Sequence, residues 1–170
     1  MRVGTALADL SAGLFAALGI LTALHERERS GRGQWVSTSL LQAQIFMLDF
    51  QAARYLMSGE VADQAGNNHP TGVPTGVFPT SDGFINISAS FGRIWEKLCE
   101  TLGRPDWKTK PEWSNQAGRL ADRAAVNAAI GEITRRKPMA DWLRAFEEVG
   151  IPSGPIYTVD KVFADPQVQH

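Results

Sequence analysis

The apolar positions near the start of the chain predict one long helix from about Ala8 to Arg29. Leucines recur there every three or four residues, the spacing of one helix face: Leu10, Leu14, Leu18, Leu21 and Leu24. Phe15, Ile20 and several alanines make the other sides apolar too, and such a helix belongs inside a larger protein. The stretch from Ala12 to Leu24 is shorter than the about 20 apolar residues of a membrane span, so no membrane partner is expected.

Two further elements are expected before the first loop-rich segment. A short strand is predicted at Gln34–Thr38, and a second helix is predicted from about Ser39 to Met57. That helix again has two apolar sides, with Leu41 and Ile45 on one and Phe46 on the other. The chain has little other material to cover two such helices. We therefore expect their cover to come from a partner chain or from sequence outside these 170 residues.

A segment rich in glycine, asparagine and proline separates this part from the rest of the chain. It runs from Ser58 to Gly83 and is the best candidate for a linker. Its end has the pattern of a β-hairpin, in which Val77–Pro79 and Phe84–Ser88 flank a turn with an Asp-Gly step.

The remainder of the chain predicts a small helix-rich unit. Helices are expected over about Phe91–Leu102, over Leu120–Arg135, and from Pro138 to Gly150. Ile151–Tyr157 would be a strand that returns to the hairpin, and Val159–Ala164 a short helical turn. The predicted fold of this chain is therefore helix-rich α+β with a few short strands.

Composition and charge narrow the class of function. A formal net charge of -1 without a basic stripe gives no basis for a nucleic-acid partner. The single cysteine, Cys99, excludes an intramolecular disulfide and a cysteine metal cluster, and its apolar neighbours at helical spacing indicate a core thiol. No metal-ligand spacing or phosphate-binding glycine loop is found, so no metal site is expected. These properties fit a cytoplasmic protein.

Two polar residues are candidates for chemistry. Asp9 lies at the head of the apolar helix, where a carboxylate can simply stabilise the helix N-terminus. The same carboxylate could instead act as a nucleophile or as a general base, and spacing alone leaves both readings open. His69 lies among glycine, asparagine and proline, which favours a hydrogen-bonding turn residue over a ligand.

Several stretches, taken in order along the chain, together resemble the family III CoA transferases, the CaiB/BaiF family. The first contains Asp9, and the set covers nearly the whole chain: Val3–Gly13, Gly31–Leu41, Gly66–Pro70, Phe78–Gly83, Val149–Ile156 and Val162–Val168. Each stretch alone is weak, whereas the ordered set is specific.

The resemblance implies that Asp9 is the catalytic aspartate of an acyl-CoA:carboxylate CoA-transferase. In such enzymes the aspartate attacks the donor thioester, and a mixed anhydride and then an aspartyl-CoA thioester follow. An acyl-CoA and an acceptor acid are thus the implied partners, with CoA thioester as substrate and no tightly bound cofactor. The loop that covers the nucleophile in relatives would lie at Ser88, Ala89, Ser90, Phe91 and Gly92, here with one glycine.

The family also implies an α/β architecture, in which two chains interlock as a homodimer and each has a Rossmann-like large domain and a small domain. Residues 1–60 would then belong to the large domain and 61–76 to a linker. Residues 77–157 would form the small domain, and 158–170 would begin a return linker. In the family most of the nucleotide-binding lobe precedes the catalytic aspartate. We therefore expect these 170 residues alone to be impaired as an enzyme.

Two alternatives remain beside the transferase. A relative of α-methylacyl-CoA racemase would use the aspartate with a histidine for proton exchange beside the thioester. The expected histidine would precede Met1, although the context from Thr5 to Asp9 is closer to the transferase branch. The other alternative is a non-catalytic module that serves only folding or oligomerisation.

Overall fold

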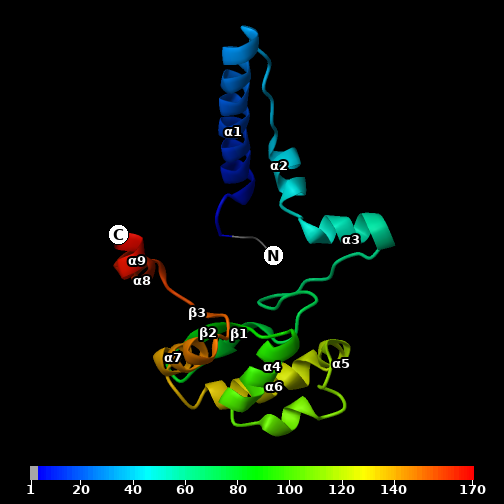
Figure 1. Cartoon of the computed structure of the whole chain (residues 1–170), viewed down its shortest axis with the longest axis vertical. Coiled ribbons are helices and arrows are strands. Elements are labelled where there is room, and N and C mark those ends of the chain that lie inside the picture. Colours follow the sequence, from blue (N-terminus) through cyan, green and yellow to red (C-terminus); the bar gives the residue numbers. More distant parts are fainter. Residues whose placement is uncertain (1–3) are drawn as a thin grey trace. The chain divides into compact units, whose positions relative to one another are not determined.

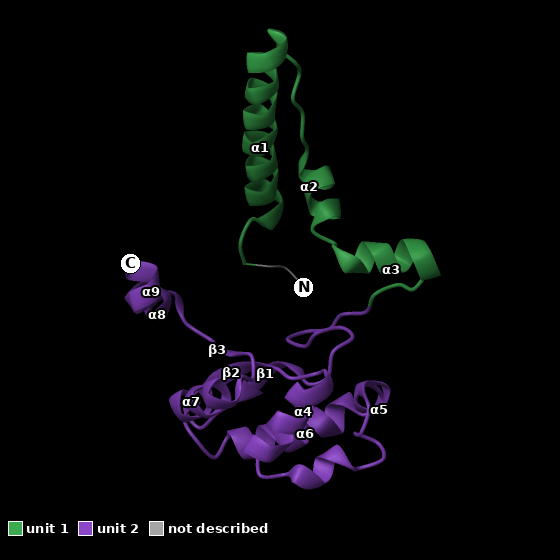
Figure 2. Cartoon of the chain, in the orientation of Figure 1, with its two compact units in different colours: residues 1–62 green, residues 63–170 purple. Residues whose placement is uncertain are grey.

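The computed structural model describes residues 4–170 and divides into two compact units. Unit 1 spans residues 1–62 and unit 2 spans residues 63–170 (Figure 2). Val3, the first residue of the stretch around Asp9 that resembles the family, lies outside the described residues.

Unit 1 is built around the long helix α1 (Leu7–Ser30), which confirms the first predicted element (Figure 1). The helix ends at Gly31, whose φ of 71° lies in the left-handed region and whose N–H donates to the Arg27 carbonyl. Glycine adopts this conformation without a Cβ clash, which is why helices commonly stop there. Arg27 and Arg29 in the last turn carry the charge that the helix C-terminus favours.

The single helix predicted over Ser39–Met57 is wrong, because the structure has two helices there. They are α2 (Leu40–Phe46) and α3 (Phe50–Ser58). The Ser39 hydroxyl accepts a hydrogen bond from the Gln42 N–H at 3.2 Å and so begins α2. Between the helices Asp49 has a φ of 50°, which no α-helix contains. The apolar pattern continues across this break, so periodicity alone could not reveal it.

The strand predicted at Gln34–Thr38 is also wrong. The segment runs without regular secondary structure, because a strand needs a hydrogen-bonded neighbour and this segment pairs with none among the described residues. Val36 lies against α1, since a Cβ placed on Gly19 would be 2.8 Å from its Cγ1. Gly19 therefore permits the close approach of this segment to the helix.

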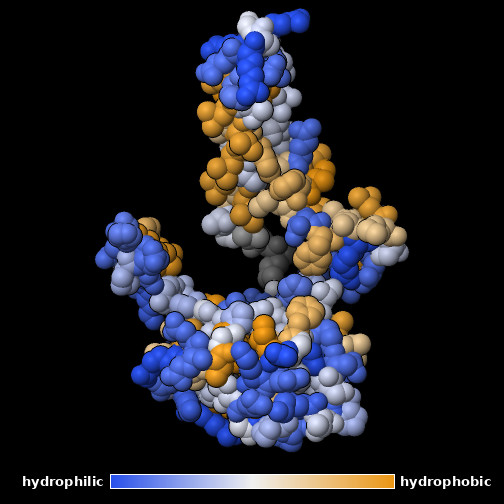
Figure 3. All heavy atoms as spheres, in the orientation of Figure 1, coloured by the Kyte–Doolittle hydropathy of each residue, from blue (hydrophilic) through white to orange (hydrophobic). Residues whose placement is uncertain are grey.

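Unit 1 leaves most of its apolar side chains exposed. Along α1 the exposed fraction is 60% for Leu10, 72% for Leu14 and 62% for Leu18, and hydrophobic atoms line the helix surface in Figure 3. By length and composition alone α1 could cross a membrane, a test that the core helices of soluble proteins also pass. The expectation that a partner chain or sequence outside these 170 residues covers α1 stays a prediction.

Unit 2 contains a three-stranded antiparallel sheet in the order β1-β2-β3. The predicted hairpin is confirmed as β1 (Thr75–Pro79) and β2 (Phe84–Ser88), with Val77 opposite Asn86. The returning strand is confirmed as the shorter β3 (Ser153–Pro155), in which Gly154 pairs with Asn86.

Helices complete unit 2, and some of them pack against this sheet. In chain order they are α4 (Gly92–Thr101), the 3-10 helix η1 (Pro105–Lys108), α5 (Gln116–Ala121), α6 (Arg123–Thr134), α7 (Met139–Val149), α8 (Val159–Ala164) and α9 (Pro166–Gln169). α6 contacts β1 and α7 contacts β3. The helix predicted over about Leu120–Arg135 is found as α6, whereas the shorter α5 before it was not predicted. The two helices are separated at Asp122, whose carboxylate accepts the Trp113 indole N–H at 2.7 Å.

The core of unit 2 is fully closed. Ile85, Ile87, Leu98 and Phe146 have no measurable exposure, and Trp142 donates its indole N–H to the Thr134 carbonyl at 2.8 Å. Cys99 is also fully buried, which confirms the predicted core thiol, and its desolvation raises the pKa of the thiol to about 12.

A polar contact joins the hairpin turn to α7. One carboxylate oxygen of Asp82 accepts hydrogen bonds from the Met139 N–H and the Thr80 hydroxyl, both at 2.8 Å. These two donors stabilise the charged form and lower the pKa of Asp82. The turn and the start of the helix are thus held together by one side chain.

Candidate active site

Asp9 lies in the first turn of α1 and its side chain is exposed. The first turn of a helix presents unpaired N–H groups and the positive end of the helix dipole, which favour an anion. Two residues further, the Ser11 hydroxyl donates back to the Leu7 carbonyl, so it does not compete for the carboxylate. Among residues 4–170 no side chain forms a hydrogen bond or ion pair with Asp9, so an incoming electrophile would meet an unencumbered carboxylate.

The loop predicted to cover the nucleophile has two distinct halves. The buried half is held to its surroundings: the Ser88 N–H donates to the Pro152 carbonyl and the Ala89 N–H to the Pro74 carbonyl, both at 2.9 Å. The Ser90 hydroxyl accepts from the Thr75 hydroxyl at 3.2 Å.

The other half of the loop is exposed and leads into α4. Phe91 is 65% exposed, and Gly92 has a φ of +48° in open space, where an added Cβ would meet no described atom within 4 Å. Gly92 is also the first residue of α4. The one glycine of the loop therefore stands where the backbone conformation disfavours other residues.

Sequence reasoning missed Arg119, whose guanidinium fixes the base of this loop. Arg119 is 3% exposed, and its Nη2 donates to the Ser90 carbonyl at 2.8 Å. Its Nε donates to the Val73 carbonyl at 3.0 Å and its Nη1 to the Trp113 carbonyl at 2.7 Å. The available signal was weak: Arg119 precedes the buried Val126 by seven residues, so a helical reading would have placed a charged residue on an inward face.

An aromatic stack supports the same guanidinium. Its carbon lies 4.6 Å from the Trp95 ring centroid, and Trp95 stacks on Trp107 with centroids 6.4 Å apart. Among residues 4–170 no carboxylate forms an ion pair with Arg119, so carbonyl dipoles and the ring face compensate its charge. Burial lowers the pKa of Arg119 from its usual value.

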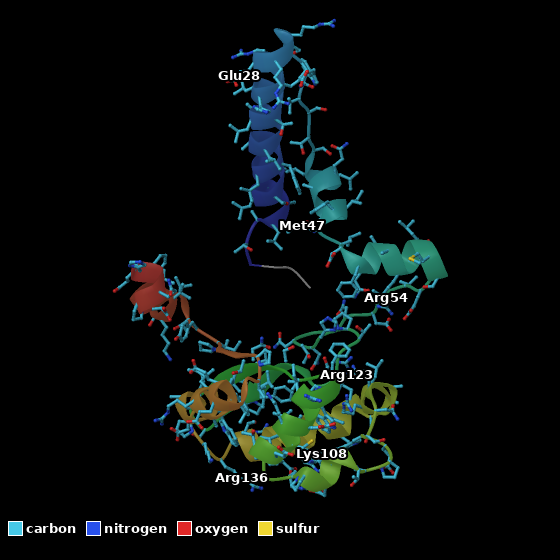
Figure 4. The ribbon with its side chains drawn as sticks, in the orientation of Figure 1. Glu28, Met47, Arg54, Lys108, Arg123 and Arg136 are labelled. Atoms are coloured by element: carbon cyan, nitrogen blue, oxygen red, sulfur yellow. The ribbon has the colours of Figure 1, made fainter. Side chains whose placement is uncertain are left out.

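A polar cavity of about 210 Å³ opens where Arg119 meets the loop. It is lined by three residues of the loop, by residues of α4, η1 and α5, and by two residues of the segment between η1 and α5. The lining residues are Ser90, Phe91, Gly92, Trp95, Glu96, Lys108, Ser114, Asn115, Gln116 and Arg119. Lys108, labelled in Figure 4, is paired with Glu100 at 2.8 Å. The structure thus brings Ser90, Phe91 and Gly92 to one cavity of unit 2, while Asp9 belongs to unit 1.

His69 is a turn residue, as predicted. Its Nδ1 accepts hydrogen bonds from the Gly72 N–H at 2.9 Å and the Thr71 N–H at 3.2 Å. Arg123, labelled in Figure 4, donates to the His69 carbonyl at 2.9 Å and to the Pro70 carbonyl at 2.8 Å. Within the described range, 4–170, no group of three His, Cys, Asp or Glu side chains could hold a metal ion.

Comparison with known proteins defines the class of this molecule. The family described as CoA-transferase family III matches residues 1–170, and the chain belongs to that family. Solved structures agree: the chain has a TM-score of 0.82 and 34% identity to a CaiB/BaiF family protein from Brucella suis, covering 99% of this chain and 45% of that one. Rv3272 from M. tuberculosis, at 24% identity and a TM-score of 0.85, shares the fold. The α/β family fold that the resemblance implied is therefore confirmed.

Curated relatives are named as CoA transferases. The chain is 32% identical over 167 residues to succinyl-CoA–D-citramalate CoA-transferase of Chloroflexus aurantiacus, covering 97% of the chain and 41% of that protein. It is 34% identical over 169 residues to succinate–glutarate CoA-transferase of Agrobacterium fabrum, covering 99% of the chain and 42% of that protein. Acetyl-CoA:oxalate CoA-transferase of Acetobacter aceti is 30% identical over 164 residues, with coverage of 96% and 42%. The chain thus spans about two fifths of the length of these relatives.

Proposed function

We propose that Asp9 is the nucleophile of a transferase that moves CoA between carboxylic acids. The observation that carries the proposal is the position of Asp9 at the head of α1, exposed and without a side-chain partner among residues 4–170, in a chain that the family matches throughout. A CoA thioester is the substrate and donor, and a second carboxylic acid is the acceptor. The names of the relatives support dicarboxylates such as succinate as one class of acid.

The reaction proceeds by acyl exchange between activated carboxyl groups. An Asp9 oxygen bonds to the thioester carbonyl carbon, the carbon–sulfur bond breaks, and CoA thiolate leaves a mixed anhydride. The thiolate then attacks the Asp9 carbonyl carbon, which releases the donor acid as its carboxylate and forms an aspartyl-CoA thioester. The acceptor carboxylate attacks the carbonyl carbon of this thioester, the carbon–sulfur bond breaks, and a second mixed anhydride forms as CoA thiolate leaves. The thiolate then attacks the acceptor acyl carbon, which gives the new acyl-CoA and frees the Asp9 carboxylate.

Each step develops negative charge on a carbonyl oxygen. Backbone N–H groups that point at such an oxyanion stabilise it, and the loss of one such donor costs about 10²–10³-fold in rate in other acyl transferases. The loop from Ser88 to Gly92 is proposed to cover the nucleophile and to exclude water during these steps.

Mass spectrometry tests the role of Asp9 directly. The longest natural protein that carries these residues is incubated with succinyl-CoA or acetyl-CoA and digested. We expect an acyl or CoA adduct on the peptide that holds Asp9, and Asp9→Asn should lower transfer by roughly 10⁴-fold or more, as expected for loss of a nucleophile. Asp63→Asn, at an exposed carboxylate in the linker, is the matched control and should keep both adduct and activity. Full transfer by Asp9→Asn would disprove the proposal.

A homodimer and a cytoplasmic location complete the proposed function. The exposed leucines of α1 support assembly, because large apolar surfaces mark interaction sites. Sedimentation equilibrium of the longest natural protein that carries these residues should give twice its chain mass, and a monomer at micromolar concentration would contradict the homodimer. Cell fractionation should recover the protein without carbonate or detergent extraction, whereas retention in the membrane pellet would indicate that α1 lies in a bilayer.

A further inference from the structure

The geometry points to Arg119 as a positioning residue that sets the loop from Ser90 to Gly92 and so determines how much acyl group is lost to water. This inference deepens the proposed function and rests on it. The proposed role of Arg119 involves no contact with the substrate. It acts through the loop, whose base it ties to two other segments of unit 2.

Three backbone segments meet at this one guanidinium. Arg119 donates to the carbonyls of Ser90, Val73 and Trp113 at distances between 2.7 and 3.0 Å. A fourth acceptor, the side-chain oxygen of Gln116, lies 3.0 Å from Nη2. Because a guanidinium is planar and its donors have fixed directions, satisfying all four acceptors leaves the group a single orientation.

The hydrogen bond from Arg119 to the Ser90 carbonyl lies at the boundary between the buried and the exposed part of the loop. On the N-terminal side Ala89 and Ser90 are buried, and on the C-terminal side Phe91 and Gly92 are exposed. Arg119 therefore holds the carbonyl of the last buried residue before the exposed half. A carbonyl bond at this point sets the direction in which the chain leaves toward Phe91 and Gly92.

Arg119 occupies a buried position at which an apolar side chain would avoid the cost of burying a charge. It is buried without a carboxylate partner among residues 4–170, stacked on Trp95 and next to the 210 Å³ cavity that the loop lines. Burying an uncompensated charge is costly. Lysine could not replace it, because an ammonium cannot reach three diverging carbonyls in one plane.

Arg123 provides an internal comparison. It lies four residues later and also donates to two backbone carbonyls, those of His69 and Pro70. These belong to the turn before β1 and not to the loop from Ser90 to Gly92. The two arginines therefore share the chemistry of their contacts and differ in the segment they hold.

The functional consequence is a partition between two fates of the acyl group. In transfer, the thiolate or the acceptor carboxylate attacks the activated carbonyl. In hydrolysis, a water oxygen bonds to the same carbon, the anhydride or thioester bond breaks, and a carboxylic acid and CoA thiol are released. A correctly placed loop excludes water and favours transfer.

The test uses Arg119→Lys and Arg119→Gln, with Arg123→Lys and Arg123→Gln as controls, in the longest natural protein that carries these residues. Transfer and thioester hydrolysis are followed separately with succinyl-CoA, with and without an acceptor acid. Hydrogen exchange is measured on the peptide that contains Phe91 and Gly92. Arg119→Lys retains the charge and serves if Arg119→Gln does not fold.

We expect both Arg119 variants to raise the ratio of hydrolysis to transfer several-fold and to speed exchange at Phe91 and Gly92. Transfer kcat should fall by about 10²-fold, the effect of a displacement of about 1 Å, with a smaller change in KM for the thioester. The Arg123 variants should lose stability without changing the ratio. Equal effects of the two arginines on the ratio would overturn the inference.

Failure of the proposed function is distinguishable from failure of this inference. If the unsubstituted protein transfers CoA from neither succinyl-CoA nor acetyl-CoA, the proposed function fails. The anchoring role of Arg119 is then decided by hydrogen exchange alone. Faster exchange at Phe91 and Gly92 in Arg119→Lys but not in Arg123→Lys supports it, and unchanged exchange overturns it.

Discussion

The two units of this chain differ in how they treat their apolar side chains. Unit 2 buries Ile87, Leu98 and Phe146 completely, whereas unit 1 leaves 72% of Leu14 exposed on its longest helix. Unit 2 therefore has what an independent domain needs, a closed core of its own. Unit 1 has the helical pattern but leaves its apolar side chains exposed among the described residues, and that a partner chain or further sequence covers them stays a prediction. Local sequence can make a helix, but only sufficient surrounding chain can bury it.

The largest difference between the two units is expected when a large apolar side chain is truncated in each. Phe146→Ala in unit 2 should cost about 3–5 kcal/mol of unfolding free energy, because it leaves a cavity in a closed core. Leu14→Ala in unit 1, at an exposed position, should change the unfolding free energy by about 0.5 kcal/mol or less. Urea unfolding of the 170-residue chain measures both. A large loss from Leu14→Ala would show that α1 is already covered in solution, which would break the comparison.

A pair of tryptophans gives a second, smaller contrast. Trp142→Phe keeps a ring in the core but leaves the Thr134 carbonyl to the longer hydrogen bond from the Lys137 N–H at 3.4 Å, which should cost about 0.5–1.5 kcal/mol. Trp35→Phe, at a side chain that is 91% exposed, should leave stability unchanged. Thermal unfolding followed by circular dichroism checks both variants. Equal shifts would mean that Trp35 is packed in solution.

The contact of Asp82 with α7 should make part of the stability of unit 2 depend on pH. The pKa of Asp82 is lowered by the Met139 N–H and the Thr80 hydroxyl, so its contribution is complete above the ordinary value of 3.8. As the pH falls below that value toward the lowered pKa, the contribution disappears. Asp82→Ala should therefore lower Tm by a few degrees at pH 7 and by less in acid.

The control for this effect is Asp82→Asn. Asparagine keeps an oxygen that can accept from Met139 and Thr80 but does not titrate, so the difference in Tm should be smaller and should not diminish below pH 4 in the same way. A difference between Asp82→Ala and the natural chain that stays constant from pH 7 to strong acid would contradict the role assigned to this carboxylate.

The sequence was most informative where structure depends on near neighbours. α1 and the β1–β2 hairpin follow from periodicity, a terminal glycine and an Asp-Gly turn, and all of these signals are local. The break between α2 and α3 and the separate helix α5 were missed because both depend on single residues. Asp122 is fixed by the indole of Trp113, and Asp49 takes a positive φ that no pattern of apolar residues announces.

The candidate site shows the same division. Asp9 could be singled out from its place at the head of an apolar helix, and the family resemblance then gave it a role that stays a prediction. Arg119 could not be found in this way, because its partners Ser90 and Val73 lie 29 and 46 residues away in the sequence. Its importance comes from tertiary structure that brings distant carbonyls to one guanidinium.

The closed environment of Cys99 has a practical consequence for experiments. It is the one cysteine of the chain, it is fully buried, and its raised pKa keeps it as the unreactive thiol at neutral pH. A cysteine introduced at an exposed position such as Leu14 or Phe91 would therefore react alone with a maleimide dye. Because Cys99 does not react, fluorescence from a dye at one of these positions reports on α1 or on the loop from Ser88 to Gly92 alone during turnover.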